Sequence, residues 1–175
     1  PRRGSAQGSP LHLRIGTGTV EANAQIFYAA DNGMFKKNGL DVDVVKLRSG
    51  TTTMAAIVAG DLQCGVANVL SLGAAHQRNV PFVMFAPGAY FDAQVPTTLM
   101  VAAVDSAVKG PKDLAGKAAA VISVGGLDQL ALDAWVDAAG VDPSQVKALE
   151  VPPSAMADAL AQGRIACAVM NDPEL

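Results

Sequence analysis

The sequence has few cationic residues and no basic cluster. Lys and Arg together number 13 against 16 Asp and Glu in 175 residues, which gives a formal net charge of -3. The cations are also scattered along the chain. A protein that grips nucleic acid needs a basic patch or stripe against the phosphate backbone. Nucleic acid is therefore not an expected partner.

Long hydrophobic runs are also missing. The longest, residues 81–86 and 98–104, fall far short of the roughly 20 apolar residues that a membrane-spanning helix needs. We therefore expect no membrane insertion of this chain. Half of the residues are nevertheless hydrophobic, so the length supports one good core or two small ones.

Signatures of catalysis are absent from the sequence. His12 lies on the polar face of a predicted strand and His76 on a predicted surface helix, and neither belongs to a Cys/His cluster with metal-ligand spacing. No Gly-x-Ser-x-Gly motif occurs. Gly16 and Gly18 lack the third glycine and the acidic partner of a dinucleotide site. We predict a protein that is not an enzyme and has no cofactor or metal.

The chain repeats itself at an offset of 103 residues. Five positions are identical in the two copies: Ala56, Gly60, Cys64, Val66 and Asn68 recur as Ala159, Gly163, Cys167, Val169 and Asn171. In each copy an apolar helix ends at a glycine and a short buried strand ends at an asparagine. Self-similarity at a fixed spacing indicates repeated structural units. Two similar units predict two similar lobes.

The surroundings of both copies support this interpretation. Alternating and helically spaced apolar residues predict, in order, a strand at 11–15, a helix at 23–38, a strand at 40–44, a helix at 49–59, a strand at 65–69, a helix from Ser71 to Arg78 and a strand at 82–85. In the second unit they predict strands at 98–103 and 118–123, a helix at 127–139, a strand at 147–151, a helix capped by Ser154 and a strand at 165–170. Strands that alternate with helices predict a mostly parallel sheet flanked by helices.

The two cysteines and the N-terminal segment bear on the compartment. Cys64 and Cys167 open predicted interior strands of different units, which favours two buried free thiols over a disulfide. Residues 1–10 are polar, without an apolar signal core. They are predicted to be a flexible stub left by signal-peptide cleavage or by expression, so they do not argue for the cytoplasm.

Three motifs resemble those of a known family. In residues 27–42 an apolar helix leads to Gly33, Met34 and Phe35, then lysines, then a Gly-Leu-x-Val entry into a strand. This run resembles the signature of the nitrate, sulfonate and taurine type substrate-binding proteins of ABC importers, a group that includes binders of thiamine pyrimidine precursors. Residues 113–117 resemble the Asp-Leu-Lys-Gly-Lys element of that family, with Ala115 in place of Lys. Residues 159–173 resemble its Gly-x-Ile-Asp-Ala strand, which ends near an acidic-Pro pair, here Asp172-Pro173.

The resemblance implies a two-lobed α/β fold of the periplasmic-binding-protein-like II type. The expected lobes are 11–96 and 97–175, with a hinge near 90–103 and an incomplete second lobe. The implied function is capture of a small anionic or aromatic solute (sulfonate, nitrate, carboxylate or pyrimidine-like) for an ABC permease, in a periplasmic or lipid-anchored extracytoplasmic protein. Two alternatives stay open: an enzyme on the same fold, of the thiamine-pyrimidine synthase or menaquinone-pathway kind, and the sensing domain of a regulator.

Candidate binding residues follow from the topology. In open α/β sheets the ligand crevice lies outside the carboxyl ends of the strands. The segments predicted to lie there contain Thr17, Gly18, Thr19, Ser49, Gly50, Thr51, Thr52, Asn68, Ser71, Gly125, Gly126, Asn171 and Asp172. First-turn helix amides lack intrahelical partners and carry partial positive charge, so these segments suit a small anion.

A simpler interpretation of the same residues also stays open. In this interpretation the hydroxyl side chains only cap their helices, and the glycines only form turns. Tyr90, where the chain leaves the first lobe, either closes over a solute or packs the hinge.

Overall fold

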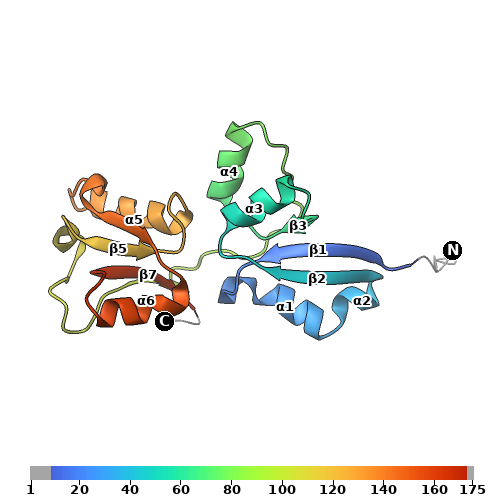
Figure 1. The fold of residues 1–175 in the computed structure, drawn as a ribbon, viewed down its shortest axis with the longest axis horizontal. Coiled ribbons are helices and arrows are strands. Elements are labelled where there is room, and N and C mark those ends of the chain that lie inside the picture. The colour runs from blue at the N-terminus through green and yellow to red at the C-terminus, as the bar shows by residue number, and fades with distance from the viewer. Residues whose placement is uncertain (1–8, 173–175) are drawn as a thin grey trace.

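The computed structural model describes residues 9–172, which form two α/β units joined by one extended connection (Figure 1). The unit built from β1 to α4 is called lobe one, and the unit built from β4 to β7 is called lobe two. Most of the predicted N-terminal stub, and Pro173 of the acidic-Pro pair, lie outside the described residues.

Lobe one is built on a three-stranded parallel sheet. The strands are β1 (Leu11–Thr17), β2 (Leu40–Lys46) and β3 (Cys64–Gly65), in the order β2-β1-β3. The helices are η1 (Glu21–Asn23), α1 (Ala24–Asp31), α2 (Met34–Lys37), α3 (Gly50–Val58) and α4 (Val69–Gln77). Helices α1 and α2 lie on the opposite side of the sheet from α3 and α4 (Figure 1).

Lobe two has a four-stranded mixed sheet. Its strands are β4 (Thr98–Val101), β5 (Ala118–Val121), β6 (Lys147–Glu150) and β7 (Cys167–Asn171), in the order β4-β7-β5-β6, and β4 alone runs antiparallel to its neighbour. The helices are η2 (Pro111–Leu114), α5 (Leu127–Asp137), η3 (Pro143–Gln145) and α6 (Pro153–Ala161).

The 103-residue repeat corresponds to a shared topology. In lobe one, β1 lies between β2 and β3, and in lobe two, β5 lies between β6 and β7. The helices before β3 and β7, α3 and α6, are followed by Gly60 and Gly163, whose φ angles are 83° and 66°. Glycine adopts this left-handed conformation without steric cost, so both helices end at the repeated glycine. The predicted pair of similar α/β units is confirmed.

Several predicted elements differ from the observed ones. The helix predicted at 23–38 is broken at Gly33, which has a φ of 65° and separates α1 from α2. The strand predicted at 65–69 stops at Gly65, because Asn68 already caps α4. The predicted strand at 82–85 is absent, and Val83, Met84 and Phe85 are exposed on the connection between the lobes.

Two predicted helix caps are also wrong. Ser71 lies within α4 and not before it, since the Asn68 side chain accepts the Ser71 N–H at 2.9 Å. Ser154 lies inside α6, which begins at Pro153. Proline suits the first helical position because its fixed φ is compatible with a helix and no amide hydrogen is needed there.

Both faces of the lobe-two sheet are packed. Strand residues alternate between the faces. Ala119 and Val121 of β5 pack with Leu132 and Val136 of α5. Ala120 packs on the other face with Met156 of α6.

The motif at 113–117 has a structural role in lobe two. The Asp113 carboxylate accepts the N–H groups of Lys109 at 2.8 Å and Gly110 at 3.0 Å. These backbone hydrogen bonds hold the pKa of Asp113 below its usual value. Leu114 is fully buried in the lobe-two core. The motif thus fixes the entry into β5 and does not reach the space between the lobes.

The cysteines are free thiols, as predicted. Cys167 is buried in β7, and burial raises the pKa of its thiol to about 11. Cys64 is only half-buried, contrary to the prediction, because β3 has no neighbour beyond it in the described sheet. Burial raises the pKa of Cys64 as well. Among residues 9–172 no helix is both long enough and apolar enough to cross a membrane.

Candidate functional site

The two lobes meet at the carboxyl ends of their parallel strands (Figure 1). A cavity of about 190 Å³ lies there, and both lobes line it. From lobe one come the residues that follow β1 and β2, and from lobe two come residues after β5 and at the start of α6: Thr19, Val20, Lys46, Leu47 and Arg48 on one side, Ile122 and Pro153 on the other. This cavity and the groups around it are called the interlobe crevice.

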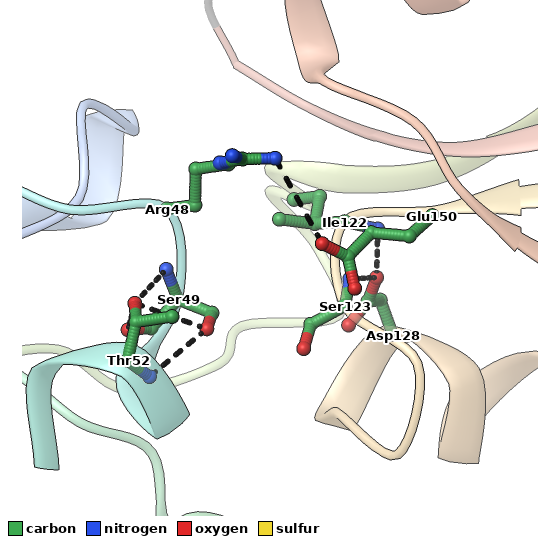
Figure 2. Close-up of polar contacts among 7 residues, drawn as sticks. All are labelled: Arg48, Ser49, Thr52, Ile122, Ser123, Asp128 and Glu150. Atoms are coloured by element: carbon green, nitrogen blue, oxygen red, sulfur yellow. Dashed lines mark hydrogen bonds and ion pairs between the residues drawn. The ribbon is translucent and has the colours of Figure 1, made fainter. Parts of the chain in front are cut away.

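Two contacts bridge the interlobe crevice. The backbone N–H of Glu21 donates to the carbonyl oxygen of Asp172 at 3.1 Å. Arg48 and Glu150 form an ion pair, with 3.9 Å between Nη1 and Oε1 (Figure 2). Arg48 comes two residues after β2, and Glu150 is the last residue of β6. Corresponding strands of the two lobes thus place opposite charges toward each other.

The cations at the crevice come from lobe one. Lys46 and Arg48 both line the cavity, and the Lys46 Nζ lies 5.9 Å from the centre of the Phe27 ring. Such a distance allows an attraction between the ammonium and the face of the ring. Across the gap, lobe two contributes the carboxylate of Glu150. The lobe-one wall is therefore the one suited to an anionic group.

The start of α3 forms a complete capping box. Ser49 accepts the Thr52 N–H at 3.3 Å, and the Ser49 N–H donates to Thr52 Oγ1 at 3.1 Å (Figure 2). Thr51 is exposed. The hydrogen bonds of the described residues leave the first-turn amides of Gly50 and Thr51 without an acceptor. Ser49 and Thr52 thus act as caps, and Gly50 and Thr51 keep free donors.

Gly50 also sets how closely α3 approaches the next helix. A Cβ atom on Gly50 would lie 3.1 Å from the Cα of Ala67, so a larger residue would push α3 away from the turn before α4. Beyond that turn, Asn68 and Ser71 are joined to each other by the cap of α4. Asn68 thus acts as the cap of α4.

The turn between β5 and α5 is held by side chains from the first turn of α5. Asp128 Oδ2 accepts the N–H groups of Ile122 and of Ser123, the latter at 3.2 Å (Figure 2). The Gly125 N–H donates to Gln129 Oε1 at 2.7 Å, and Gly126 is buried. The side chains of Asp128 and Gln129 thus take amides of the turn before α5, whereas the N-cap residue Gly126 provides no side-chain cap.

The binding residues predicted in the turn after β1 differ in whether they reach the cavity. Thr17 is 0% exposed, and its hydroxyl donates to the carbonyl of Gly18 at 3.3 Å. Gly18 also accepts a hydrogen bond from the Asn23 side chain at 3.3 Å. Thr19 lines the cavity. Among the predicted residues, Thr19 is thus the one placed on the cavity wall, and Thr17 offers no side-chain surface to it.

The end of β7 lies beside the crevice through its backbone. Asp172 accepts the Glu21 N–H, and its own N–H donates to the carbonyl of Thr97 at 3.0 Å. The Asn171 side chain accepts a hydrogen bond from the Thr98 hydroxyl on β4. Tyr90 is 88% exposed on the connection and is not brought to the cavity wall.

Arg48, Lys46 and Glu150 were not predicted from the sequence. Lys46 and Arg48 lie at or just beyond the end of β2, and Glu150 ends β6, the equivalent strand of lobe two. The 103-residue repeat carries that information, because it identifies equivalent strands whose ends must face one another. A search for charged residues at these paired strand ends would have found them. Among residues 9–172 no group of three or more His, Cys, Asp or Glu side chains could hold a metal ion.

Comparisons with known proteins assign the family. The model of the family described as "NMT1/THI5 like" matches residues 21–173. The chain belongs to this family. The taurine-binding periplasmic protein of Escherichia coli is 31% identical over 139 residues, which cover 78% of this chain and 41% of that protein.

Solved structures show the same fold at low sequence identity. The periplasmic aliphatic sulphonate binding protein of Escherichia coli superposes with a TM-score of 0.66 at 19% identity, over 95% of this chain and 56% of that one. The alkanesulfonate-binding protein of Xanthomonas axonopodis pv. citri bound to MOPS gives a TM-score of 0.72 at 17% identity, over 95% and 56%. This chain therefore has the periplasmic-binding-protein fold predicted from the sequence. It spans about half the length of the relatives that it matches.

Proposed function

We propose that this NMT1/THI5-like chain belongs to the solute-binding component of an ABC importer. It captures a small anionic solute in the interlobe crevice and presents the closed form to a permease outside the cytoplasm, in the periplasm or on a lipid anchor. The observation that carries the proposal is the crevice itself, a small cavity at facing strand ends with Lys46 and Arg48 on its wall. The relatives named for taurine and sulfonates support the choice of solute class.

The anionic group of the solute is placed on lobe one. Arg48 supplies a guanidinium whose donors match a sulfonate or carboxylate. The free amides of Gly50 and Thr51 lie next to it in the chain, at the positive end of α3. The amides of the β5–α5 turn are taken by Asp128 and Gln129. Lobe two therefore closes over the solute and does not compete for its anionic group.

Closure is a shift of population between open and closed arrangements. A solute favours the closed state only by contacts that it makes better there, which requires groups from both lobes. Thr19 and Arg48 from lobe one and Ile122 and Pro153 from lobe two meet this requirement. The proposed role is therefore binding, as the names of the matched relatives also indicate.

A thermal-shift screen of the full-length protein tests this function. The panel is taurine, alkanesulfonates, nitrate, aromatic carboxylates and pyrimidines. A solute at 100 times its dissociation constant stabilises the native state by about 2.7 kcal/mol, which raises the melting temperature by several degrees. We expect that shift with a sulfonate. Failure of the whole panel, together with turnover of a metabolite by the same protein, would replace the transport proposal by an enzymatic one.

A further inference from the structure

We infer that the outer face of α5 is a docking surface for the permease, and that it takes an amphipathic helix whose apolar residues are flanked by Lys or Arg. The inference rests on the proposed function and adds to it a surface and the chemistry of the partner segment. It depends on α5 and not on the residues that line the interlobe crevice, so docking and solute binding can be tested separately.

The helix α5 is apolar on two opposite faces. On the inner face, Leu132 and Val136 are fully buried in the lobe-two core. On the outer face, apolar residues recur at intervals of three and four, which places them along one side of a helix. This outer face, called the α5 face, consists of Leu127, Leu130, Ala131, Ala134, Trp135 and Ala138. All of its residues are exposed.

The α5 face has no cover among residues 9–172. Leu127, Leu130 and Trp135 are 44%, 49% and 37% exposed, and Figure 1 shows no described element over α5 on the side away from the sheet. A surface helix ordinarily has charged and polar residues on its solvent side. Contiguous apolar surface that stays exposed is typical of an interaction site.

The charges beside the α5 face are negative. Residues 118–146 contain four Asp and no Glu, Lys or Arg. Asp133 follows Leu130 by three residues, and Asp137 follows Ala134 by three, so both acids border the α5 face along one edge. Neither acid takes part in an ion pair among the described residues. A complementary partner therefore brings cations to this edge.

These two acids do not stabilise the helix that carries them. The C-terminal end of a helix favours cations, but α5 ends at Asp137 and has no basic residue in its last turn. Like charges four residues apart on a helix, such as Asp133 and Asp137, are also unfavourable. Lys or Arg side chains of a partner would relieve both effects. The charge pattern thus favours a basic partner over a surface that remains free.

The same charges disfavour two other occupants of the α5 face. A second copy of this chain would set Asp133 and Asp137 against the acids of its own α5 in either orientation, because α5 contains no cation to pair with them. An anionic membrane surface attracts basic segments and repels acidic ones. A protein segment with apolar residues between basic flanks meets neither difficulty.

The position of α5 relates this surface to the permease. Ile122 lines the interlobe cavity, and its amide is held by Asp128 in the first turn of α5 (Figure 2). The α5 face begins at Leu127, in that same turn. A segment docked on the α5 face would therefore lie beside the crevice from which the solute must pass to the permease.

Trp135 provides the signal for the test, because it is the only tryptophan of the chain and belongs to the α5 face. The probe is a synthetic amphipathic helix of about 18 residues with leucines at helical spacing and lysines on both flanks. A second peptide has glutamate in place of each lysine. Titration into the full-length protein, followed by Trp135 emission, gives both dissociation constants. We expect the lysine peptide to bind at least about tenfold more tightly.

The apolar part of the α5 face is tested with Leu130→Asp. This variant should weaken binding of the lysine peptide at least about tenfold, because it places a charge in an apolar contact. Val69→Asp is the matched control, since Val69 is an exposed apolar residue of α4 in lobe one, and it should leave the affinity unchanged. The melting temperature of each variant without peptide shows that it is folded.

The acidic edge is tested with the double variant Asp133→Asn, Asp137→Asn. The preference for the lysine peptide should fall below about threefold, which leaves only the weak interactions of exposed charges. Asp31→Asn with Asp158→Asn is the matched control. It makes the same change of net charge at exposed positions of α1 and α6 and should keep the full preference.

Several results would overturn the inference. These are equal affinity for the two peptides, no response of Trp135 emission, or a loss in Val69→Asp as large as that in Leu130→Asp. A dimer in sedimentation equilibrium that Leu130→Asp abolishes would also overturn it, because a second copy would then occupy the α5 face. The α5 variants should leave the thermal shift with solute unchanged, so failure of the docking surface leaves the proposed solute binding intact. Discrimination between the peptides by a protein that binds no solute would overturn the assignment to a permease.

Discussion

The two lobes share a topology but differ in how much they bury. In lobe two, α5 and α6 cover opposite faces of the sheet, and each face has its own cluster of buried side chains. In lobe one the buried hydrophobic residues within the described chain are Ile15, Met54 and Leu62. Helices α1, α2 and α4 of lobe one contain no fully buried residue. The two copies of the repeat thus share a topology but bury different numbers of hydrophobic residues.

This difference separates the requirements of binding from those of stability. The interlobe crevice needs only that strand ends and helix starts face one another, which topology provides in both lobes. Global stability follows the apolar surface that is buried, and most of that lies in lobe two. Regions with few buried contacts open at lower free energy than the global unfolding reaction. We therefore expect lobe one to deform more easily than lobe two, which is the more rigid of the two lobes.

The largest effect should come from truncation in the lobe-two core. Leu132 is fully buried between α5 and the sheet. Leu132→Ala should lower the free energy of unfolding by about 2–5 kcal/mol, because it removes apolar contacts and leaves a cavity that the packed surroundings cannot fill. Urea denaturation measures the loss. Leu130→Ala on the exposed side of the same helix should change stability by less than about 0.5 kcal/mol.

Met54→Ala truncates a buried residue of the lobe-one core and tests the comparison directly. Met54 is buried in α3, but its surroundings contain fewer buried side chains and can relax around the truncation. We expect a smaller loss of stability than for Leu132→Ala. A larger loss for Met54→Ala would show that lobe one carries more of the stability than its buried residues indicate.

The next effect should come from the close approach of α3 to the lobe-one sheet. Gly16 and Gly65 are register partners on β1 and β3, and a Cβ atom on Gly65 would collide with the Thr53 methyl group and lie 2.8 Å from the Gly16 carbonyl oxygen. Gly65→Ala should therefore cost about 1–3 kcal/mol through overpacking. The measurement is again urea denaturation.

Gly73→Ala is the control for this substitution. Gly73 lies inside α4, where an added Cβ would meet nothing within 4 Å. Alanine there should stabilise the helix by about 0.5–1 kcal/mol. If Gly65→Ala is tolerated as well as Gly73→Ala, α3 can move away from the lobe-one sheet. The deeper core of lobe two is then the better explanation of why lobe two is the more rigid lobe.

The sequence predicts the lobes well because periodicity and the repeated glycines are local signals. Gly60 and Gly163 end their helices in both copies, and those positions need no tertiary information. The strand predicted at 82–85 fails because apolar residues form a strand only where a neighbouring edge accepts them, and β3 is only two residues long. The site was harder to predict. Ser49 and Thr52 form the cap of α3, whereas Ser71 and Ser154 lie inside their helices. Arg48 and Glu150 form a contact between distant segments, which local patterns do not reveal.

The smallest effect should come from the cap of α3, where capping and solute binding were the two interpretations of Ser49. Ser49→Ala removes the acceptor of the Thr52 N–H and should lower the free energy of unfolding by about 1 kcal/mol without any solute present. In lobe two, the N-cap residue of α5, Gly126, makes no side-chain cap, so this prediction applies to lobe one alone. Thermal unfolding of the solute-free protein measures the change.

Thr51→Ala separates the two roles of this turn. Its side chain is exposed, so this substitution should leave solute-free stability within about 0.5 kcal/mol of the original. The backbone amide of residue 51, which we assign to the solute, is kept in both variants. Sulfonate affinity should therefore change little in Thr51→Ala, and in Ser49→Ala it should fall only as far as the start of α3 frays. A strong loss of affinity in Thr51→Ala with unchanged stability would instead make the Thr51 hydroxyl a direct solute contact, and lobe one would then bind by side chains where we assign backbone amides.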